Sequence, residues 1–460
     1  MNIQLVMANY KNYYFIGIGG IGMSAIARYF KHQGFAVSGY DRAPSALTHA
    51  LESEGIGVHY DDDVEAIPKD VEHTFVIYTP AIPAELSELQ YVRRNGYALC
   101  KRSQALGEIA RGQECLAVSG THGKTTTSTL LAHILTASGE GCSAFLGGIS
   151  KNYDSNLLLS RNPVLVAEAD EFDRSFLQLF PHIAVVTATD ADHLDIYNDH
   201  AHVVEAFGEF ASQVDADGCL LVKQGVEVPL DKVRARVLHY AYDTPCDFYA
   251  SDITPLPGGR FDFTLNHPGG RIAHCQVGIP GWVNVENAVA ASAIALLHGT
   301  DPEKIREALA TFQGVKRRFD IHVNTPEIAY IDDYAHHPNE IRAAISSMRN
   351  IFPGRHLLGV FQPHLYTRTR DFADDFADAL SGLDALILLP IYPAREEPIP
   401  GVSSQIIFDK VRLDDKVLVE KNHLMDTLSG RKIDCLVTFG AGDVDRFIEP
   451  ITDWLTHRNG

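Results

Sequence analysis

The stretch from Ser119 to Thr127, Ser-Gly-Thr-His-Gly-Lys-Thr-Thr-Thr, follows the apolar run 115–118 and has most parts of a phosphate-binding loop. The usual pattern G-x-x-x-x-G-K-S/T needs a glycine at position 118, where this chain has Val118. The phosphate-binding parts are nevertheless present, because Gly123 allows close backbone approach, Lys124 can reach the β- and γ-phosphates and a following hydroxyl can bind Mg²⁺. We therefore expect ATP here; the alternative is a glycine turn that carries Lys-Thr by chance.

A second glycine motif, Gly17-Ile-Gly-Gly-Ile-Gly22, lies between an expected strand and an expected helix, and Asp41 ends the next strand. Glycines at these spacings let the backbone approach a diphosphate that rests on the helix N-terminus. Taken alone, the motif predicts NAD. The alternative is a tight turn without a ligand.

Acidic residues end two further strands beside the first loop. Glu168 ends the strand 163–168, and a carboxylate beside such a loop normally completes the ligand shell of Mg²⁺. An exposed acidic loop explains Asp170, Glu171 and Asp173 equally well. His193 follows the strand 183–187 and is either a second metal ligand or a hydrogen-bonded ring.

Polar residues also follow two strands near the C-terminus. The sequence Asp332-Asp-Tyr-Ala-His-His-Pro338 ends one strand, and Gln362 to Arg370 follows the next. Arg368 and Arg370 are either solvated cations or partners of an anion, since cations at a helix start oppose the helix dipole. We expect a polar rim at this edge of a sheet.

These motifs need α/β domains to position them. Strands and helices alternate along the chain, which predicts three α/β domains. The first, residues 1–105, is expected to be Rossmann-like; the second, residues 106–315, a P-loop ATPase-type parallel sheet with an antiparallel addition; the third, residues 316–460, doubly wound and Rossmann-like. The expected strands include 13–19, 36–40, 74–78, 115–118, 163–168, 183–187, 220–223, 237–242, 260–265, 272–277, 328–333, 357–361, 385–389 and 435–439, and the expected helices include 22–32, 103–111, 284–298 and 369–380.

Composition narrows the class of protein. The 460 residues carry a formal net charge of −20, which argues against a broad nucleic-acid or anionic-membrane surface. The seven cysteines include no C-x-x-C pair, so we expect reduced thiols in a cytoplasmic chain. We see no signal peptide and no run of eighteen apolar residues, and expect no membrane span.

Three function classes fit parts of the pattern. A dehydrogenase uses the first glycine motif and leaves Lys124 idle, whereas a phosphotransferase uses Lys124 and leaves that motif idle. A nucleotide-regulated binding protein uses both, but gives no role to His193, His336 or Arg368.

In order and spacing, the motifs resemble those of the Mur ligases over nearly the whole chain. They are Gly120-Thr-His-Gly-Lys-Thr-Thr-Thr127, Glu168-Ala-Asp-Glu171, Asp192-His193, Asn284 with Asn287, Arg317-Arg-Phe319, Asp332 to Pro338, Gln362-Pro-His364 and Tyr366 to Arg370. The resemblance implies an N-terminal domain for a UDP-sugar, a central ATPase and a C-terminal domain that admits an amino acid. It explains the shorter loop, and it replaces NAD by the diphosphate of UDP.

Within the family, Gly17 to Gly22 followed by Met23-Ser24 is most similar to members that join L-alanine to the lactyl carboxylate of UDP-N-acetylmuramate. Those members make a peptidoglycan precursor through an acyl phosphate and release ADP and phosphate. The resemblance implies Mg²⁺, with Mn²⁺ able to substitute, and a monomer or weak homodimer. The rival within the family attaches a preformed tripeptide to the same sugar, but its first glycine loop usually reads differently.

The resemblance also implies roles for individual residues. ATP would be bound by Gly120, Thr121, His122, Gly123, Lys124, Thr125, Thr126, Asn284, Asn287, Arg318 and Asp333. The UDP-sugar would be bound by Gly17, Gly19, Gly20, Ile21, Gly22, Asp41, Thr79 and Ala81. The metal ligands would be Thr125, Glu168 and His193, and the catalytic residues Lys124, His193, His336 and Arg368.

The chain departs from the family pattern at several positions. Ala188-Thr-Asp190 stands in place of Asn-Ile-Glu, Val283 in place of His, Ala335 in place of Gly and Leu365 in place of Arg. The last change concerns the amino acid most. Alanine would be held by Arg368 with His364 or Arg370, or the acceptor would be glycine or serine.

Overall fold

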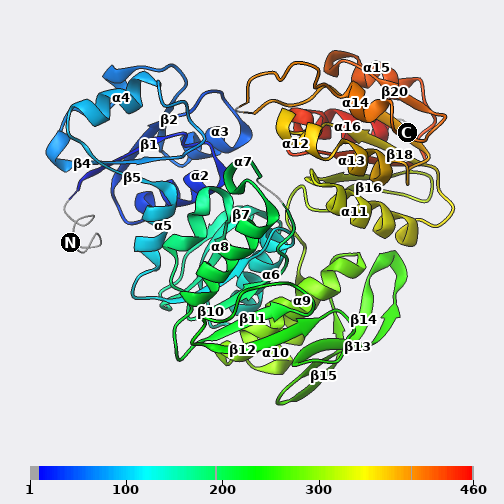
Figure 1. Cartoon of the computed structure of the whole chain (residues 1–460), viewed down its shortest axis with the longest axis horizontal. Coiled ribbons are helices and arrows are strands. Elements are labelled where there is room, and N and C mark those ends of the chain that lie inside the picture. Colours follow the sequence, from blue (N-terminus) through cyan, green and yellow to red (C-terminus); the bar gives the residue numbers. More distant parts are fainter. Residues whose placement is uncertain (1–9, 192–193, 395, 458–460) are drawn as a thin grey trace. The chain divides into compact units, whose positions relative to one another are not determined.

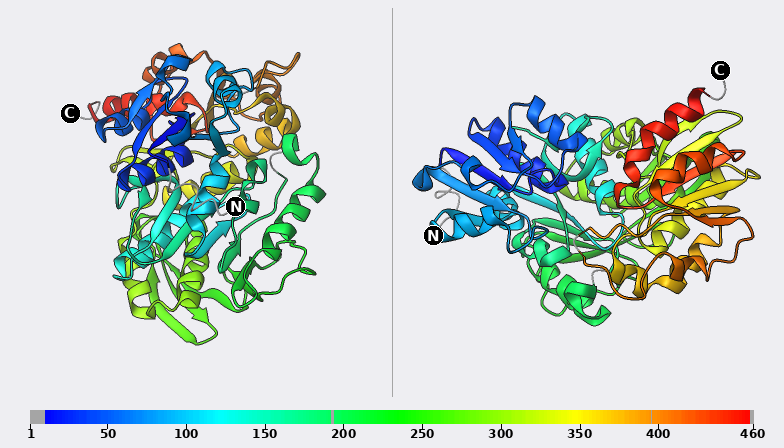
Figure 2. Two further views of the ribbon diagram at one scale, coloured as in Figure 1. Left: turned by 90° about the vertical axis from the view of Figure 1, so that its left-hand side faces the viewer. Right: turned by 90° about the horizontal axis from the view of Figure 1, so that it is seen from above.

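The computed structural model describes residues 10–191, 194–394 and 396–457, which form three sheets flanked by helices (Figure 1). The chain divides into two compact units. The first contains the N-terminal and central sheets, and the second contains the C-terminal sheet with the segments 255–261 and 279–284. Figure 2 shows the sheets from two further sides. The three-domain α/β fold expected from the sequence is confirmed.

The N-terminal sheet has five parallel strands in the order β3-β2-β1-β4-β5. This is the Rossmann strand order 3-2-1-4-5-6 without its last strand, with the topological switch point between β1 and β4. Side chains of β1 alternate between two cores, with Tyr13 and Phe15 in one and Tyr14 and Ile16 in the other. The elements are β1 Asn12–Ile16, α2 Ile21–His32, β2 Ala36–Tyr40, α3 Ala46–Ser53, β3 Gly57–His59, β4 Thr74–Tyr78, α4 Ser87–Arg94, β5 Ala98–Lys101 and α5 Arg102–Ala110.

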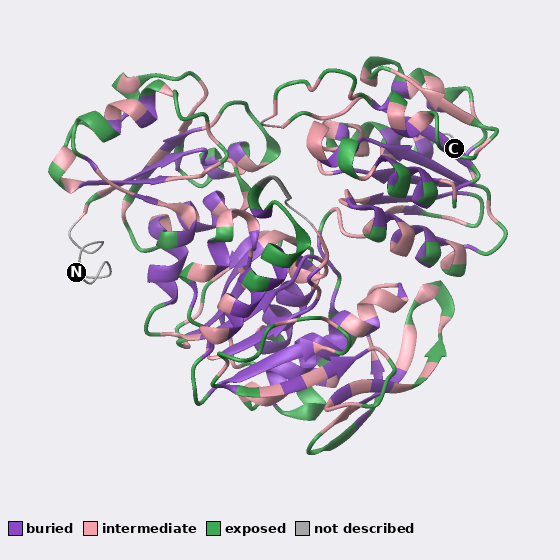
Figure 3. Ribbon diagram, in the orientation of Figure 1, coloured by how far each residue is buried: buried purple, intermediate pink, exposed green. Residues whose placement is uncertain are grey.

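The central sheet has ten strands in the order β15-β14-β13-β12-β11-β10-β6-β9-β7-β8. Its middle strands are parallel and mostly buried (Figure 3), while β7–β8 and β14–β15 are antiparallel pairs at the two ends. The elements are β6 Glu114–Ser119, α6 Lys124–Ala137, β7 Ser143–Ser150, β8 Ser155–Leu158, β9 Val164–Ala169, β10 Ile183–Val186, α7 Leu194–Tyr197, α8 His200–Ser212, β11 Cys219–Lys223, β12 Arg236–Ala241, β13 Phe248–Pro255, β14 Phe261–His267, β15 Gly270–Gln276, α9 Trp282–His298 and α10 Pro302–Thr311.

A buried asparagine of β8 joins the central sheet to the first helix. Asn156 Nδ2 donates to Ile21 O at 2.6 Å and to Ser24 Oγ at 2.9 Å, both in α2, and Asn156 Oδ1 accepts from Arg28 Nη1 at 2.5 Å. Asn156 is fully buried, so its side-chain amide needs these partners, which also bond elsewhere: Ser24 Oγ donates to Ile21 O at 2.9 Å, and Arg28 pairs with Glu54. The sequence analysis did not identify this residue.

We expect Asn156→Ala to lower the free energy of unfolding by about 1–3 kcal/mol, because the change removes the hydrogen bonds that a fully buried side chain makes to α2. The measurement is urea unfolding followed by circular dichroism. The matched control is Asn95→Ala, since the exposed Asn95 donates only to Tyr91 O of its own helix. Equal effects of the two substitutions would contradict a linking role for Asn156.

The C-terminal sheet has six strands in the order β16-β17-β21-β18-β19-β20, all parallel except β16. The helix expected over 369–380 is wrong in detail, because two helices, α12 and α13, meet at Phe372. The elements are β16 Asp320–Asn324, β17 Ala329–Asp333, α11 Pro338–Ile351, β18 Leu357–Phe361, α12 Tyr366–Asp371, α13 Ala373–Leu380, β19 Ala385–Leu388, α14 Gln405–Phe408, β20 Lys416–Leu418, α15 Leu424–Ser429, β21 Cys435–Phe439 and α16 Ile448–His457.

Two expectations about the whole chain can be compared with the structure. All seven cysteines lie in described residues and are free thiols. Among the helices of the described ranges, none is both long enough and apolar enough to cross a bilayer.

Candidate functional site

The loop between β6 and α6 has the geometry of a phosphate-binding loop. Gly120 and Gly123 have φ values of 131° and 80°, in the left-handed range that favours glycine. A Cβ at Gly120 would lie 2.1 Å from Thr187 Oγ1. The segment after β10 also fixes the loop, because Thr121 N donates to Ala188 O at 3.0 Å. The short loop is therefore a defined structure whose backbone leads directly into the N-terminus of α6.

Lys124, the first residue of α6, lies among acceptors at the loop. Its Nζ donates to Gly120 O at 2.5 Å and to Glu171 Oε1 at 3.0 Å, and its side chain is only 13% exposed. Burial alone would lower the pKa of Lys124, but the nearby carboxylates of Glu171, Asp170 and Glu168 outweigh burial and raise it. The ammonium is therefore charged and is held at the loop by these acceptors.

Thr125 and Glu168, two of the expected metal ligands, contact each other. Thr125 Oγ1 donates to Glu168 Oε1 at 3.1 Å, and Glu168 Oε2 accepts from Gly147 N at 3.0 Å. A Cβ at Gly147 would lie 2.2 Å from Glu168 Oε2, so this glycine leaves the space that the carboxylate fills. A hydroxyl and a carboxylate are hard oxygen donors, and the pair fits a Mg²⁺ ion beside a bound triphosphate.

His122 and Asn287 also lie at the loop. His122 Nε2 is 3.2 Å from Asp190 Oδ2, and Asp190 N donates to Thr121 Oγ1 at 3.1 Å. Asn287 Oδ1 accepts from Thr127 Oγ1 at 3.3 Å. The structure therefore brings these predicted ATP residues together in the first unit.

Three further residues were expected to bind ATP or the metal: Thr126, Asn284 and His193. Thr126 is the third residue of α6 and is half-buried. Asn284 Nδ2 donates to Pro280 O at 2.6 Å, within the second unit. His193, expected as a metal ligand and catalytic residue, lies outside the described residues.

The first glycine motif forms a turn between β1 and α2 that Asp41 braces. Gly19 N donates to Asp41 Oδ2 at 2.7 Å, and Gly17 N donates to Tyr40 O at 2.8 Å. A Cβ at Gly19 would lie 2.8 Å from Asp41 Oδ2. Asp41 therefore binds the glycine loop itself and holds its backbone in place.

The next strand end lies against the same turn. A Cβ at Gly17 would lie 2.5 Å from Thr79 Cγ2, and Ala81 N donates to Thr79 Oγ1 at 3.3 Å. Gly20 is the N-cap of α2, which begins at Ile21. The structure thus places the predicted UDP-sugar residues around one helix N-terminus, which suits an anionic diphosphate.

A cation that the sequence analysis missed lies beside this turn. A Cβ at Gly22 would lie 2.7 Å from Arg102 Nη1, so the glycine allows the guanidinium to cross the first turn of α2. Arg102 Nη2 is 3.4 Å from Asp170 Oδ2 of the central domain. The available signal was its position, since Arg102 directly follows β5 at the carboxyl edge of the sheet.

In the second unit, Arg317 anchors the end of β17. Its Nε donates to Asp332 Oδ2 at 3.1 Å, and its Nη2 donates to Gly440 O at 2.7 Å. Asp332 is 0% exposed and also accepts from Thr438 Oγ1 at 2.6 Å. Burial raises the pKa of Asp332 although Arg317 opposes the shift. The guanidinium of Arg318, an expected ATP contact, lies over the ring of Tyr334, 4.9 Å from its centroid.

His336, His364 and Arg368 lie together in the second unit. Arg368 Nη1 is 3.4 Å from His364 Nδ1, and the ring centroids of His336 and His364 are 6.2 Å apart. Arg368 is 6% exposed, whereas the side chain of Arg370 is 53% exposed and its Nε donates to Asp371 Oδ1 at 2.7 Å. Of the two helpers considered for Arg368, the structure places His364 beside it.

Asp333, the last residue of β17, makes the stability of the fold depend on pH. Burial raises the pKa of Asp333 to about 7, although Arg318 and the donated Ala335 N–H act against the shift. Because the folded-state pKa exceeds the unfolded value, the folded protein binds the proton more tightly between about pH 4 and pH 7. The contribution of Asp333 to stability is therefore present at low pH and is lost as the pH rises to about 7.

We expect Asp333→Asn to remove this contribution, so that the variant becomes more stable than the wild type above pH 7 and similar to it near pH 4. An asparagine Oδ1 can still accept from Ala335 N. The measurement is urea unfolding at several pH values. The pKa of Asp332 is also raised, so only the difference in the free energy of unfolding between variant and wild type reports on Asp333. If this difference does not change with pH, the raised pKa of Asp333 is wrong.

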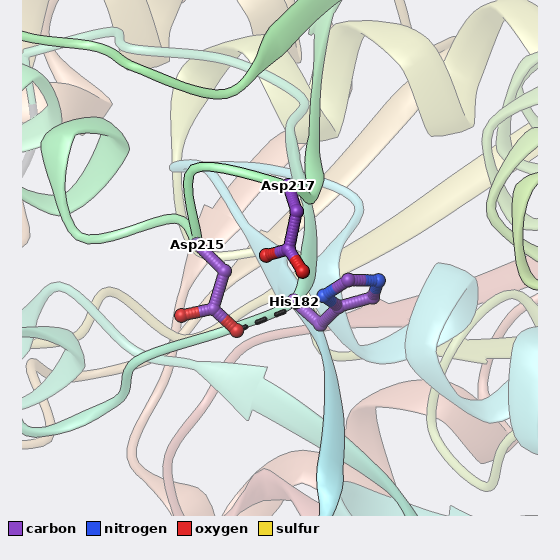
Figure 4. A group of neighbouring side chains, drawn as sticks. All are labelled: His182, Asp215 and Asp217. Atoms are coloured by element: carbon purple, nitrogen blue, oxygen red, sulfur yellow. Dashed lines mark ion pairs between the residues drawn. The ribbon is translucent and has the colours of Figure 1, made fainter.

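One cluster elsewhere in the described residues has the composition of a metal site. It consists of His182, Asp215 and Asp217, whose nearest ligand atoms lie within 4.8 Å of one another (Figure 4). His182 precedes β10 and is 3.6 Å from Asp215. The cluster thus lies at the amino end of β10, opposite to the carboxyl end where the loop 119–124 lies, and it does not include an expected metal ligand.

Comparisons with known proteins agree along the whole chain. Three family models match: the Mur ligase family catalytic domain at residues 12–114, the Mur ligase middle domain at 118–295, and the Mur ligase glutamate ligase domain at 317–442. The chain is 51% identical over 448 residues to the UDP-N-acetylmuramate–L-alanine ligase of Parabacteroides distasonis, with 96% of each chain covered. It is 50% identical to the protein of that name from Porphyromonas gingivalis, covering 97% of this chain and 99% of the relative.

A solved structure is similar over the same range. It is the UDP-N-acetylmuramate-alanine ligase of Thermotoga maritima, with a TM-score of 0.81 and 27% identity. The alignment covers 96% of this chain and 99% of that one.

Proposed function

The chain belongs to the Mur ligase family, and we propose from this premise that it joins L-alanine to the lactyl carboxylate of UDP-N-acetylmuramate at the expense of ATP. The product is a precursor of peptidoglycan. The observation that carries the proposal is the likeness over 96% of the chain to ligases of that name, together with the contacts among Lys124, Thr125 and Glu168. A dehydrogenase would have no use for these contacts.

In the first step, an oxygen of the lactyl carboxylate attacks the γ-phosphorus and ADP leaves, which gives an acyl phosphate. Two anions approach each other in this step, so Lys124 stabilises the charge that develops on the transferred phosphoryl group. Thr125 and Glu168 would hold Mg²⁺, with Mn²⁺ able to substitute; when bound, the ion withdraws negative charge from the phosphate oxygens. Asn287 would contact the nucleotide beside the loop.

In the second step, the amine of alanine attacks the carbonyl carbon, phosphate leaves and the nitrogen loses a proton. Arg368 would bind the alanine carboxylate through a bidentate pair. His336 and Asp333 would lie beside the amine and the nucleotide. Arg318 would contact the transferred phosphate, and Asn284 would contact the adenine. Around α2, the glycine turn with Asp41, Thr79 and Ala81 would bind the UDP-sugar diphosphate.

The experiment measures phosphate release with UDP-N-acetylmuramate and a panel of alanine, glycine, serine and the family's tripeptide. We expect ADP and phosphate only when the UDP-sugar and an amino acid are both present, with alanine preferred. Phosphate release with UDP-N-acetylmuramate and the tripeptide, but with no single amino acid, would favour the family's tripeptide-attaching ligase. Saturable NADH binding without phosphate release would favour a dehydrogenase, and nucleotide binding without turnover would favour a binding protein.

Several finer points are part of the same proposal. The domains are residues 1–105, 106–315 and 316–460, the protein works in the cytoplasm, and it is a monomer or weak homodimer. Light scattering of the purified protein at several concentrations tests the oligomeric state.

A further inference from the structure

Glu171 is a buried carboxylate to which the proposed reaction has assigned no role. It directly precedes the short helix Phe172–Gln178 and is 1% exposed. Both of its oxygens lie near Lys124 Nζ, Oε1 at 3.0 Å and Oε2 at 2.8 Å. The alternative of an exposed acidic loop, left open by the sequence, is therefore wrong for this residue.

The surroundings fix Glu171 independently of Lys124. Tyr197 Oη donates to Glu171 O at 2.6 Å, and Arg174 N donates to the same carbonyl at 2.9 Å. The next turn contains two consecutive non-glycine residues, Asp173 and Arg174, with φ values of 54° and 53°. Such conformations cost free energy and persist only where neighbouring contacts enforce them. The backbone therefore presents the carboxylate to the loop in a defined position.

The contacts of Lys124 limit how it can meet a phosphate. An ammonium group has three N–H donors, and three groups accept from this one: Gly120 O, Glu171 Oε1 and Thr121 O, the last at 3.4 Å from Nζ. A phosphate oxygen that reaches Lys124 must therefore share or displace one of these acceptors. Glu171 is the only negatively charged acceptor among these three contacts, so it is the one that a phosphate also repels.

We propose that Glu171 is a positioning residue that holds the ammonium of Lys124 at the loop when no phosphate is bound and yields it when phosphate arrives. A buried lysine without a counter-ion is unfavourable, so Glu171 keeps Lys124 in place and charged. The same charge weakens phosphate binding. This proposal rests on the proposed ATP site and adds a built-in competitor to it.

The test compares the wild type with Glu171→Gln, which keeps the size and hydrogen-bonding oxygen of the side chain but removes its charge. By calorimetry we expect inorganic pyrophosphate, without divalent metal, and MgADP to bind about five- to thirtyfold more tightly to the variant, the difference between a charge-assisted and a neutral hydrogen bond. Adenosine, which has no phosphate, should bind equally to both. In turnover, the KM for MgATP should fall while the KM for alanine stays unchanged.

Two further variants complete the test. Glu171→Asp keeps the charge but moves it away from Lys124, so its pyrophosphate affinity should lie between those of the other two proteins; this variant decides the matter where Glu171→Gln does not fold. Glu209→Gln is the matched control, because Glu209 forms an exposed ion pair with Arg174 close by in the chain. It should leave all affinities unchanged.

The outcomes separate this proposal from the one it rests on. If the wild type does not bind MgADP, the ATP site itself is wrong. If the wild type binds MgADP but Glu171→Gln binds pyrophosphate no more tightly, Glu171 does not compete with phosphate. Weaker MgADP binding with unchanged metal-free pyrophosphate binding would instead make Glu171 a support of the metal, and would also overturn the proposal.

Discussion

Replacement of Lys124 by alanine is expected to abolish ATP-dependent phosphate release, the largest effect of any substitution considered for this chain. Among the contacts of the described residues, the Lys124 ammonium is the only cation that bonds to both Gly120 O and Glu171. Neutralisation of the transferred phosphoryl group depends on this charge. We expect the rate to fall by at least about a thousandfold, as is typical when a principal charge-stabilising group is removed. Phosphate release with UDP-N-acetylmuramate and alanine measures it.

The same substitution also leaves Glu171 buried without its cation, which costs about 3–5 kcal/mol of stability. The double variant Lys124→Ala with Glu171→Gln removes both charges and should recover part of this stability without recovering turnover. Lys304→Ala serves as the matched control, because Lys304 Nζ donates only to a backbone carbonyl, Ser138 O, at 2.8 Å. Near-normal turnover in folded Lys124→Ala would remove the ATP assignment.

The sequence predicted the strands and loops that carry strong local signals. Glycine turns between an apolar run and a helix identify both ligand loops, and the buried parallel strands β1, β6, β9 and β10 have continuous apolar sequences. Short edge strands were missed, among them β3, β8, β16 and β20, because their sequences carry few apolar residues and pairing with a neighbour decides their conformation.

The contacts of three polar side chains were not predicted, for a common physical reason. Glu171, Arg102 and Asn156 each act through partners far along the chain: Lys124, Gly22 and α2. A local acidic or polar sequence is the same whether the side chain is exposed or buried. Only the tertiary contacts determine whether it is buried. This explains why the position of Glu168, at a strand end beside the loop, could be read from the sequence, while the burial of Glu171 three residues later was left open.

The departure at position 365 has a structural counterpart. Leu365 is buried, has a φ of 71° and forms the N-cap of α12, where the family usually has arginine. Its backbone is held by Leu365 N donating to Tyr392 O at 3.0 Å, and its carbonyl accepts from Thr369 Oγ1 at 2.7 Å. Leu365 therefore sets the start of α12 and hence the position of Arg368, one turn later. Because position 365 carries no guanidinium, the amino-acid carboxylate is assigned to Arg368 in the proposed reaction.

Arg368→Ala is accordingly expected to raise the KM for alanine by about 10- to 150-fold, the loss of roughly 1.5–3 kcal/mol for hydrogen bonds to a charged group. The KM for ATP should change far less. Arg368→Lys should fall between, because lysine keeps the charge but lacks the planar fork that binds a carboxylate bidentately. Initial rates at saturating UDP-N-acetylmuramate measure these constants, and thermal unfolding checks that loss of the buried side chain has not disrupted α12.

The matched control is Arg370→Ala, two residues away on the same helix, where the guanidinium is exposed and pairs with Asp371. We expect it to leave the KM for alanine within about twofold of the wild type, since exposed ion pairs contribute little. A larger effect at Arg370 than at Arg368 would transfer the carboxylate to Arg370. If both variants keep the wild-type KM, the alanine carboxylate binds elsewhere, and the contact between Arg368 and His364 serves only to support the strand end after β18.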